Sequence, residues 1–546
     1  MKHSILILFL LLSSGIIIAQ RPHFSLQDTL RGSITPERSW WDLTWYHLDI
    51  KVNPSDSTIT GSNTISYKVL RSSNLMQVDL QPPLAITSAY QDGQKLEIKD
   101  LGNAHFIKLI SPQLPGTVRS VLINYSGHPK VATRPPWEGG ITWTRDKNGT
   151  PWIASSCQGA GASLWWPCKD HMYDEPDSML ISVTVPNNLT DVSNGRLRSV
   201  TENRKEKTKT FNWVVVNPIN NYGVNINIGD YVNFSEKFKG EKGMLDCSYW
   251  VLKQDLEKAR VHFKQVPKML EAFEYWFGPY PFYEDSYKLV EAPYLGMEHQ
   301  SSVTYGNGFQ NGYSGHDLSG TGWGDKWDFI IVHESGHEWF ANNITYRDIA
   351  DMWIHESFTN YSESLYTEYF YGKEAGKEYV RGTRKNILND RPITGIYDVN
   401  NEGSGDMYYK GGNMLNTLRR IVNDDAKWRE MLRGINKDFY HQVVDANQVE
   451  DYISEKTGLD LRTFFDQYLH DTRIPVFEYY VKGNELNFRW SNCVRGFNMP
   501  LIIKAGGKEM KINPKNWWSK LSLDIPDASI VVDPDFYVAV MNIMGK

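Results

Sequence analysis

The sequence predicts a multidomain α+β protein in which a helix-rich region separates two β-rich regions. Three observations support this fold class. The chain has 546 residues, which exceeds what one hydrophobic core normally organises and predicts three or four folded units. Apolar residues recur at every second position up to about residue 235 and at spacings of three and four up to about residue 473. The period-two pattern then returns up to residue 546.

Residues 1–19 are predicted to be a signal peptide. Lys2 provides the basic start, a largely apolar run extends from Ile5 to Ile18, and Ala19 supplies a small residue before the cleavage point. An uncleaved membrane anchor is disfavoured because the run is short for a bilayer span. We therefore expect an exported protein, periplasmic or extracellular, with no stable membrane span after signal removal.

Residues 20–235 are predicted to form an N-terminal antiparallel β domain. Apolar and polar residues alternate in two clear stretches, and a turn cluster at Asn53–Asp56 separates the first strand from the next. The alternating apolar positions are Tyr46, Leu48, Ile50 and Val52 in the first stretch and Val224, Ile226 and Ile228 in the second.

Residues 236–473 are predicted to form an α+β domain. A first amphipathic helix ends at Gly278–Pro281, and a short strand is expected at residues 287–290. Further helices are expected over residues 325–342 and 354–371, and helical character continues to about residue 470. The apolar positions of the first helix are Leu256, Ala259, Phe263, Val266, Leu270 and Phe273, and a later helix is marked by Met414, Leu418 and Ile421.

Residues 474–546 are predicted to form a small C-terminal β domain. Gly483–Asn484 and Gly506–Gly507 each lie between alternating runs, as the turns of β-hairpins do. We therefore expect the domain order β, α+β, β along the mature chain.

The composition is that of an ordinary globular protein. Hydrophobic residues make up 41% of the chain and the net charge is -6, so there is no basic surface signal and no nucleic-acid partner is expected. None of the four cysteines has the C-x-x-C spacing of a metal or redox site. Packing and a disulfide are both open for them: Cys157, Cys168, Cys247 and Cys493.

The motif with the most chemical content is an H-E-x-x-H pentad followed by a distant glutamate. His333 and His337 are four residues apart, so on a helix their imidazoles can reach one point. Glu356 can supply a third ligand, and these donors suit one Zn²⁺ per chain with the fourth position open. Glu334 adjoins the first ligand and is placed to act as general base.

The surroundings of the pentad support a buried metal helix. Residues 329–332 are apolar and Trp339 and Phe340 follow the motif, which disfavours a solvated helix. Buried imidazoles need partners, and a metal provides one. Glu363, two turns after Glu356, is a candidate to hold a zinc-bound histidine, and a plain surface carboxylate is the open alternative.

Together with Trp339, Asn342 and Thr345, the H-E-x-x-H-x18-E arrangement resembles the aminopeptidase N family of zinc metallopeptidases, which also contains leukotriene A hydrolase. Three further segments support the resemblance. Leu295–His299 resembles the G-x-M-E-N exopeptidase motif, Tyr408–Gly411 resembles Y-x-K-G, and Ser156–Gly159 resembles the segment that lends a Gln or Glu to the amino-terminus pocket. The resemblance covers nearly all of the mature chain and implies a thermolysin-like α+β catalytic domain at residues 236–473.

The resemblance implies roles for individual residues. Glu298 would hold the α-ammonium group of a peptide substrate, with Gln158 assisting, by charge-assisted hydrogen bonds. The Gly296 and Met297 backbone would pair with the substrate. Tyr408 would stabilise the oxyanion, with the adjacent Tyr409 as the alternative. His299 stands where the family usually has Asn, which could alter the amine pocket.

The resulting hypothesis is an exported zinc aminopeptidase that acts on peptides with a free N-terminus. A secreted zinc endopeptidase is the nearest alternative, favoured if His299 disrupts amine binding. A non-catalytic peptide-binding protein of the same fold would usually have lost Glu334 or a ligand, and all are present. An epoxide hydrolase is less favoured because no sequence feature marks a lipid tunnel.

Overall fold

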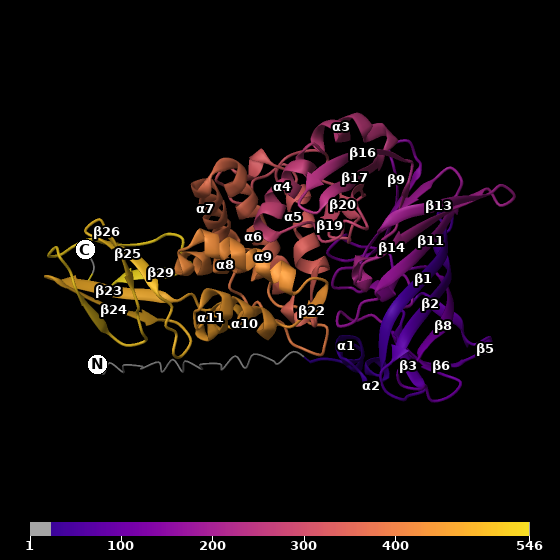
Figure 1. The fold of residues 1–546 in the computed structure, drawn as a ribbon, viewed down its shortest axis with the longest axis horizontal. Helices are drawn as coiled ribbons and strands as arrows, with labels where there is room; N and C mark the ends of the chain where they lie inside the picture. Colours follow the sequence, from indigo (N-terminus) through magenta and orange to yellow (C-terminus); the bar gives the residue numbers. More distant parts are fainter. Residues whose placement is uncertain (1–22, 545–546) are drawn as a thin grey trace, which may run out of the picture.

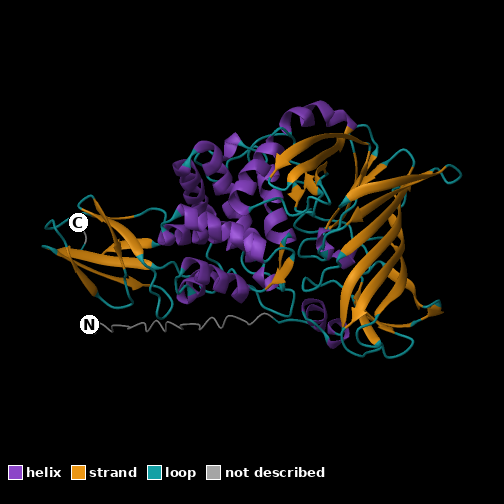
Figure 2. Cartoon of the chain, in the orientation of Figure 1, coloured by secondary structure: helices purple, strands orange, loops and turns teal. Residues whose placement is uncertain are grey.

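The structure is a computed structural model, and it describes residues 23–544. The predicted signal peptide at residues 1–19 lies outside the described residues. Within them, no helix has the length and apolar character needed to cross a membrane. The three regions follow one another along the long axis of the molecule, with strands at both ends and helices between them (Figures 1 and 2). This arrangement confirms the predicted fold class.

An eight-stranded sheet dominates the N-terminal region. The alternating side chains predicted to face its core, Tyr46 to Val52, are buried. All neighbours are antiparallel except β1 and β11, which run parallel. The prediction of a wholly antiparallel domain therefore misses one pair, because strands so far apart in sequence leave no local signal of their direction. The order is β13 (Arg196–Asn203), β14 (Thr208–Val215), β11 (Ser178–Pro186), β1 (Trp41–Asn53), β2 (Thr58–Val69), β8 (Val118–Gly127), β4 (Ala85–Gln91) and β5 (Gln94–Lys95).

Smaller elements complete the N-terminal region. Helix α1 (Leu26–Gly32) and helix α2 (Pro36–Ser39) precede the first strand. A four-stranded sheet has the order β12 (Thr190–Val192), β15 (Asn227–Gly229), β10 (Pro151–Ser156) and β9 (Gly140–Arg145), and a three-stranded sheet has the order β3 (Leu75–Asp79), β7 (Ala104–Lys108) and β6 (Glu97–Leu101).

A five-stranded sheet opens the middle region. Its first strand, β16, contains the predicted domain boundary at residue 235, so we propose a boundary near Asp230, between β15 and β16. Strand β19 is the last in the order and pairs only with β20 within this sheet. The order is β16 (Tyr231–Gly240), β17 (Gly243–Leu252), β18 (Tyr287–Glu291), β20 (Val303–Tyr305) and β19 (Gly296–Met297).

The helices of the middle region differ from the predicted ones at two points. The first apolar stripe forms two helices, because Pro267 lacks an N–H and is tolerated only in the first turn of a new helix. Within the helix predicted over 325–342, only α5 forms a regular α-helix, and a distorted turn (Glu338–Asn342) follows it. The helices are α3 (Leu256–His262), α4 (Gln265–Phe277), α5 (Phe329–Gly336), α6 (Trp353–Tyr371), α7 (Lys373–Gly382), α8 (Tyr409–Val422), α9 (Asp425–Asp438), α10 (Ala446–Thr457) and α11 (Arg462–Leu469).

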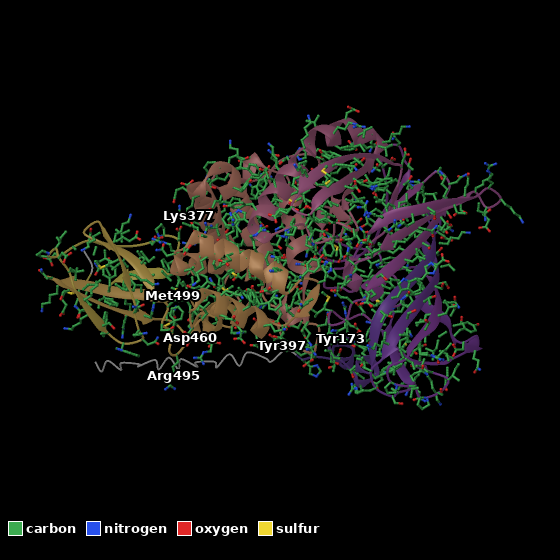
Figure 3. The ribbon with its side chains drawn as sticks, viewed as in Figure 1. Tyr173, Lys377, Tyr397, Asp460, Arg495 and Met499 are labelled. Carbon is green, nitrogen blue, oxygen red and sulfur yellow. The ribbon has the colours of Figure 1, made fainter. Side chains whose placement is uncertain are left out.

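The C-terminal region consists of two small sheets. The turns predicted at Gly483–Asn484 and Gly506–Gly507 are hairpins, as β23–β24 and β25–β26 pair around them. Lys377 of α7 binds Asp535 at 2.8 Å and lies where helices meet the C-terminal strands (Figure 3). The strand orders are β27 (Ser519–Ser522), β24 (Glu485–Ser491), β23 (Val476–Lys482), β29 (Ala539–Asn542), and β26 (Lys508–Ile512), β25 (Leu501–Ala505), β28 (Ile530–Val532).

The cysteines are free thiols, and three of the four are buried. Of the two readings left open by the sequence, the structure therefore supports packing. Cys157 donates a hydrogen bond to the carbonyl of Tyr222 at 3.2 Å, and burial raises the pKa of both Cys157 and Cys168. These thiols remain protonated and unreactive at neutral pH.

Lys288 of β18 links the middle region to the N-terminal strands. Its ammonium group donates to the carbonyl of Gly195 and lies 5.5 Å from the ring centroid of Trp213. The side chain is buried, and this burial lowers the pKa of Lys288 to about 7. A buried amine of this kind makes stability depend on pH.

Lys288→Met is expected to remove this pH dependence. In the unfolded chain a lysine has a pKa of about 10.4. Above pH 7 the unfolded chain therefore holds one more proton than the folded protein. The free energy of unfolding should rise with pH through this window, by at most about 1.4 kcal/mol per pH unit. Below pH 7 both states are protonated and the term is constant.

Urea unfolding of the wild-type and variant proteins at pH 7, 8 and 9 measures this difference. The matched control is Lys51→Met, because Lys51 is exposed and its one ion pair within residues 23–544 is with exposed Glu206. Equal pH slopes for wild type and Lys288→Met would show that Lys288 does not titrate in this range.

Candidate metal centre and active site

The pentad lies on α5, which begins at a strong cap. The Asp328 side chain accepts hydrogen bonds from the amides of Ile330 (2.9 Å) and Ile331 (3.1 Å), which satisfies the free N–H groups at the helix start. Helix α5 ends at Gly336, and His337 is its C-cap residue. Glu356 lies in the first turn of α6, which packs against α5. His333, Glu334, His337 and Glu356 are all buried.

The three predicted metal ligands lie together. Glu356 Oε2 is 3.7 Å from His333 Nε2 and 3.4 Å from His337 Nε2. One ligand atom from each residue falls within 4.8 Å of the others. The two imidazole centroids are 5.0 Å apart with an interplanar angle of 84°, so the rings approach one point from different directions.

The donor set fits zinc. Glu356 Oε2 is buried and has no hydrogen-bond partner among the described residues, as expected of an atom that serves a metal. Each imidazole uses Nδ1 elsewhere: His333 Nδ1 lies 2.8 Å from Glu363 Oε1, and His337 Nδ1 lies 3.0 Å from the Phe340 carbonyl. Both Nε2 atoms remain available, and two imidazoles with one carboxylate form a common zinc-binding set.

Glu363 is a buried partner of the site and not a surface carboxylate. Besides His333, it accepts hydrogen bonds from Asn360 (3.1 Å) and from the Tyr379 hydroxyl (2.7 Å). Thr359 plays a similar part for His337, with its hydroxyl 3.1 Å from Nδ1. These contacts fix the orientation of both imidazoles. Thr359, three residues after Glu356, could have been found from helical spacing, whereas Tyr379 carries no local signal.

The charges at the centre determine the protonation of the two key glutamates. Burial alone raises the pKa of Glu356, but His337 and His333 together hold it below the ordinary value, so this carboxylate stays ionised. Burial raises the pKa of Glu334 to about 7, and the nearby Glu298 carboxylate adds to the rise. A carboxyl group with such a pKa can accept and return a proton near neutral pH.

Glu334 lies beneath the edge strand β19. A methyl group added to Gly296 would lie 3.2 Å from Glu334 Oε1 and 2.7 Å from the Ile330 side chain, so only glycine lets the strand approach the helix this closely. Glu298, Glu334 and His337 form a second group of converging donor atoms. The predicted base and the predicted amine ligand therefore lie beside the metal centre.

Gln158 reaches the site from the N-terminal region. It follows β10, and its Nε2 donates to Glu298 Oε1 (2.6 Å) and to Glu356 Oε1 (2.9 Å). Asn342 Nδ2 holds the Glu298 carbonyl at 2.9 Å. Met297 belongs to edge strand β19 together with Gly296. The structure thus brings together all four predicted substrate-binding residues.

Tyr408 lies over the metal ligands, whereas Tyr409 lies farther out. The Tyr408 ring stacks on His333, with centroids 6.0 Å apart and an interplanar angle of 27°. Burial and the carboxylates of Glu356 and Glu298 raise the pKa of Tyr408, so its hydroxyl stays protonated and can donate. Burial and Glu363 raise the pKa of Tyr409, and the metal ligands do not contribute. Of the two tyrosines, the geometry favours Tyr408.

His299 does not add a charge to the amine pocket. It is fully buried, its Nδ1 lies 3.3 Å from the Thr304 hydroxyl, and burial lowers the pKa of His299 to about 3. The imidazole is therefore neutral at physiological pH and cannot repel a substrate ammonium group. The departure from the family Asn leaves the charge of the pocket unchanged.

Comparison with known proteins identifies relatives of this chain. Residues 261–468 match the peptidase family M1 domain. "Probable aminopeptidase 1" of Sulfurisphaera tokodaii is 22% identical over 67% of this chain and 48% of the relative. "Leucine aminopeptidase 2" of Vanderwaltozyma polyspora is 25% identical over 79% of this chain and 66% of the relative. The chain therefore spans between about half and two thirds of these two curated relatives.

Two further comparisons cover a larger share of the matched protein. "Leukotriene A-4 hydrolase" of Xenopus laevis is 21% identical over 81% of this chain and 73% of the relative. The fold is similar to that of an M1 zinc metallopeptidase from Deinococcus radiodurans, with a TM-score of 0.67, 20% identity, and coverage of 80% of this chain and 97% of that chain. The fold is therefore that of zinc metallopeptidases, and the donor set is one that can hold zinc. Within the chain, the matched segment, residues 261–468, is a peptidase family M1 domain.

Proposed function

We propose that the protein is a zinc-dependent aminopeptidase that removes N-terminal residues from peptides. The observation that carries this proposal is the contact of Gln158 with Glu298 and Glu356 at 2.6 and 2.9 Å. The Glu298 carboxylate and a predicted metal ligand thus share one amide donor, and a carboxylate at this position would attract an α-ammonium group, which supports the proposal. The names of the curated relatives support the same activity.

The orientation of the Gln158 amide suits amine binding. Its Nε2 donates to two carboxylates, and the Oε1 of the same amide is a hydrogen-bond acceptor. A substrate ammonium group between this oxygen and Glu298 would gain charge-assisted hydrogen bonds. Strand β19 offers backbone groups at a sheet edge for pairing with the substrate. The first peptide bond would then lie next to the ligands of the metal.

The proposed hydrolysis assigns one task to each remaining residue. Zinc held by His333, His337 and Glu356 would supply Lewis acidity toward the scissile carbonyl and toward water. Glu334 takes a proton from the attacking water and returns it to the leaving amine, so the proton count balances. The Tyr408 hydroxyl donates to the oxygen that becomes negative during attack.

The test compares a free-amino substrate with its N-acetylated form. Wild-type protein should hydrolyse an aminoacyl p-nitroanilide, lose activity with a zinc chelator, and cleave the acetylated compound at least about 100-fold more slowly. Glu298→Gln should lower kcat/KM for the free-amino substrate by about 10- to 150-fold, since a hydrogen bond to a charged group contributes about 1.5–3 kcal/mol.

Glu257→Gln on α3 is the matched control, because Glu257 is exposed and pairs only loosely with Arg260. Equal rates for the free and acetylated substrates would instead identify an endopeptidase. Full activity in Glu298→Gln would remove Glu298 from the amine pocket.

We also propose that the protein is exported. The basic start, apolar run and small residue at the end of residues 1–19 support this proposal. N-terminal sequencing of protein recovered outside the cytoplasm should then begin at Gln20. Recovery of intact protein beginning at Met1 in the cytoplasm alone would contradict export.

A further inference from the structure

We propose that Arg31 is a positioning residue that holds Gln158 in place for substrate amine binding. Arg31 Nη2 donates to the carbonyl of Gly159 at 2.8 Å, and Gly159 directly follows Gln158. The inference rests on the proposed function, because Gln158 matters there as part of the amine pocket.

The loop that carries Gln158 is a tight turn. The amides of Ala160 and Gly161 bond back to the carbonyls of Gln158 (2.6 Å) and Cys157 (2.7 Å). Gly159 and Gly161 have φ values of 65° and 87°, in the region that glycine adopts most readily. The turn thus fixes its own shape, but it needs outside contacts to fix its place relative to Glu298 and Glu356.

Arg31 and Asp170 enclose this turn. A methyl group added to Gly161 would lie 2.4 Å from Arg31 Nη2 and 2.3 Å from Asp170 Oδ2. Asp170 accepts hydrogen bonds from the amides of Ala162 and Ser163, both at 3.2 Å. Asp170 therefore holds the far end of the turn, and Arg31 holds the end next to Gln158.

Arg31 is itself well anchored. Arg38 is fully buried and donates to the carbonyls of Arg31 (3.0 Å) and Ser33 (2.9 Å) while its other nitrogen binds Asp79 at 2.5 Å. His171 Nε2 lies 3.1 Å from the Gly32 carbonyl. The Tyr173 hydroxyl donates to the Arg38 carbonyl at 3.0 Å, near the border of the helices and the N-terminal sheets (Figure 3).

Helix α1 also contacts the segment that leads to Tyr408. A methyl group on Gly32 would lie 2.0 Å from the Asn400 amide nitrogen, so the helix end packs directly on that backbone. The cavity left between these parts is only about 40 Å³ and is lined by Arg31, Gly32, Gly159 and Asn400, among others. On the side that faces α1 and Asn400, the loop that carries Gln158 is therefore closely packed.

Removing the Arg31 side chain should affect binding of the substrate amine, measured as KM, more than the chemical step, measured as kcat. The Gly159 carbonyl would lose its donor, and the preceding Gln158 amide could move away from Glu298. The metal ligands and Glu334 would keep their contacts. Arg31→Ala should therefore raise KM for a free-amino p-nitroanilide about tenfold, with kcat within about twofold of wild type.

A double-mutant cycle separates positioning from a general structural role. If Arg31 acts through Gln158, then Arg31→Ala should have no further effect on KM in the Gln158→Ala background. Arg71→Ala is the matched control, because Arg71 also donates to a carbonyl of the N-terminal region, that of Ser39 at 3.2 Å. It should leave KM unchanged. An unchanged KM in Arg31→Ala, or equal effects in both backgrounds, would overturn the proposal.

Hydrogen–deuterium exchange tests the same contact without any catalysis. In zinc-loaded and metal-free protein alike, Arg31→Ala should speed exchange in the segment 157–161 relative to wild type and Arg71→Ala. Unchanged exchange would overturn the proposal. If wild-type protein cleaved no free-amino substrate, the proposed function would fail while this measurement still decided the role of Arg31.

Discussion

Replacing Glu334 by glutamine is expected to lower kcat by about 10²- to 10⁴-fold, the range that general acid–base catalysis contributes. Glutamine has nearly the same size but cannot accept a proton from water. Bound zinc should remain at the wild-type level, because Glu334 is not one of the three predicted ligands. Steady-state kinetics with an aminoacyl p-nitroanilide, together with zinc analysis of the purified protein, measures both quantities.

The control for this experiment is Glu374→Gln. Glu374 is exposed on α7, so the substitution tests whether removing any glutamate lowers activity. A Glu334→Gln protein with wild-type kcat would show that another group serves as the base. Loss of zinc in that variant would assign Glu334 to the metal instead.

Replacing Glu356 by glutamine is expected to weaken zinc binding by more than about 100-fold and to abolish hydrolysis. The change removes the only anion among the three ligands, while two neutral imidazoles remain. Glu363→Gln provides a graded comparison, because Glu363 bonds to the predicted ligand His333 and such partners typically contribute about 10- to 100-fold in affinity.

Competition with a chromophoric zinc chelator ranks the wild-type protein and the two variants. The expected order of affinity is wild type, then Glu363→Gln, then Glu356→Gln. Wild-type affinity in Glu356→Gln would exclude this residue as a ligand. A greater loss in Glu363→Gln than in Glu356→Gln would make Glu363 the ligand.

Local patterns in the sequence were sufficient for much of the fold. The alternation from Tyr46 to Val52 predicts a strand because side chains of a strand alternate between two faces, and these residues are buried in β1. The turns at Gly483 and Gly506 were predicted because hairpins need residues that accept positive φ, and both have it. The four-residue spacing of His333 and His337 predicted one helical face.

Contacts between distant segments could not be predicted in this way. Strand β21 (Ile344–Tyr346) pairs in parallel with β22 (Gln442–Val444), inside a stretch that was predicted to be mostly helical. Three-residue strands are too short to show a period. The end of α5 at Gly336 was also missed, because the apolar Trp339 and Phe340 continue a helical pattern after the backbone has left it.

In the candidate site, too, local spacing predicts some residues, whereas contacts between distant segments could not be predicted from it. The pentad follows from spacing, whereas the contact of Gln158 with Glu356 spans 198 residues and was anticipated only through the family resemblance. Tyr379 and Arg31 were not anticipated at all. Each contributes through where the fold places it, and neither lies in a motif whose spacing implies a contact.

The position of Gln158 has a consequence for how selectivity is maintained. All three predicted zinc ligands come from the middle region, but the Gln158 amide comes from the N-terminal sheets. A displacement of one region against the other by an ångström would disturb recognition of the free amino end while leaving the ligands in place. On the proposed function, discrimination between chain ends and internal bonds thus depends on docking between regions, to which distant contacts such as Lys288 with Gly195 contribute.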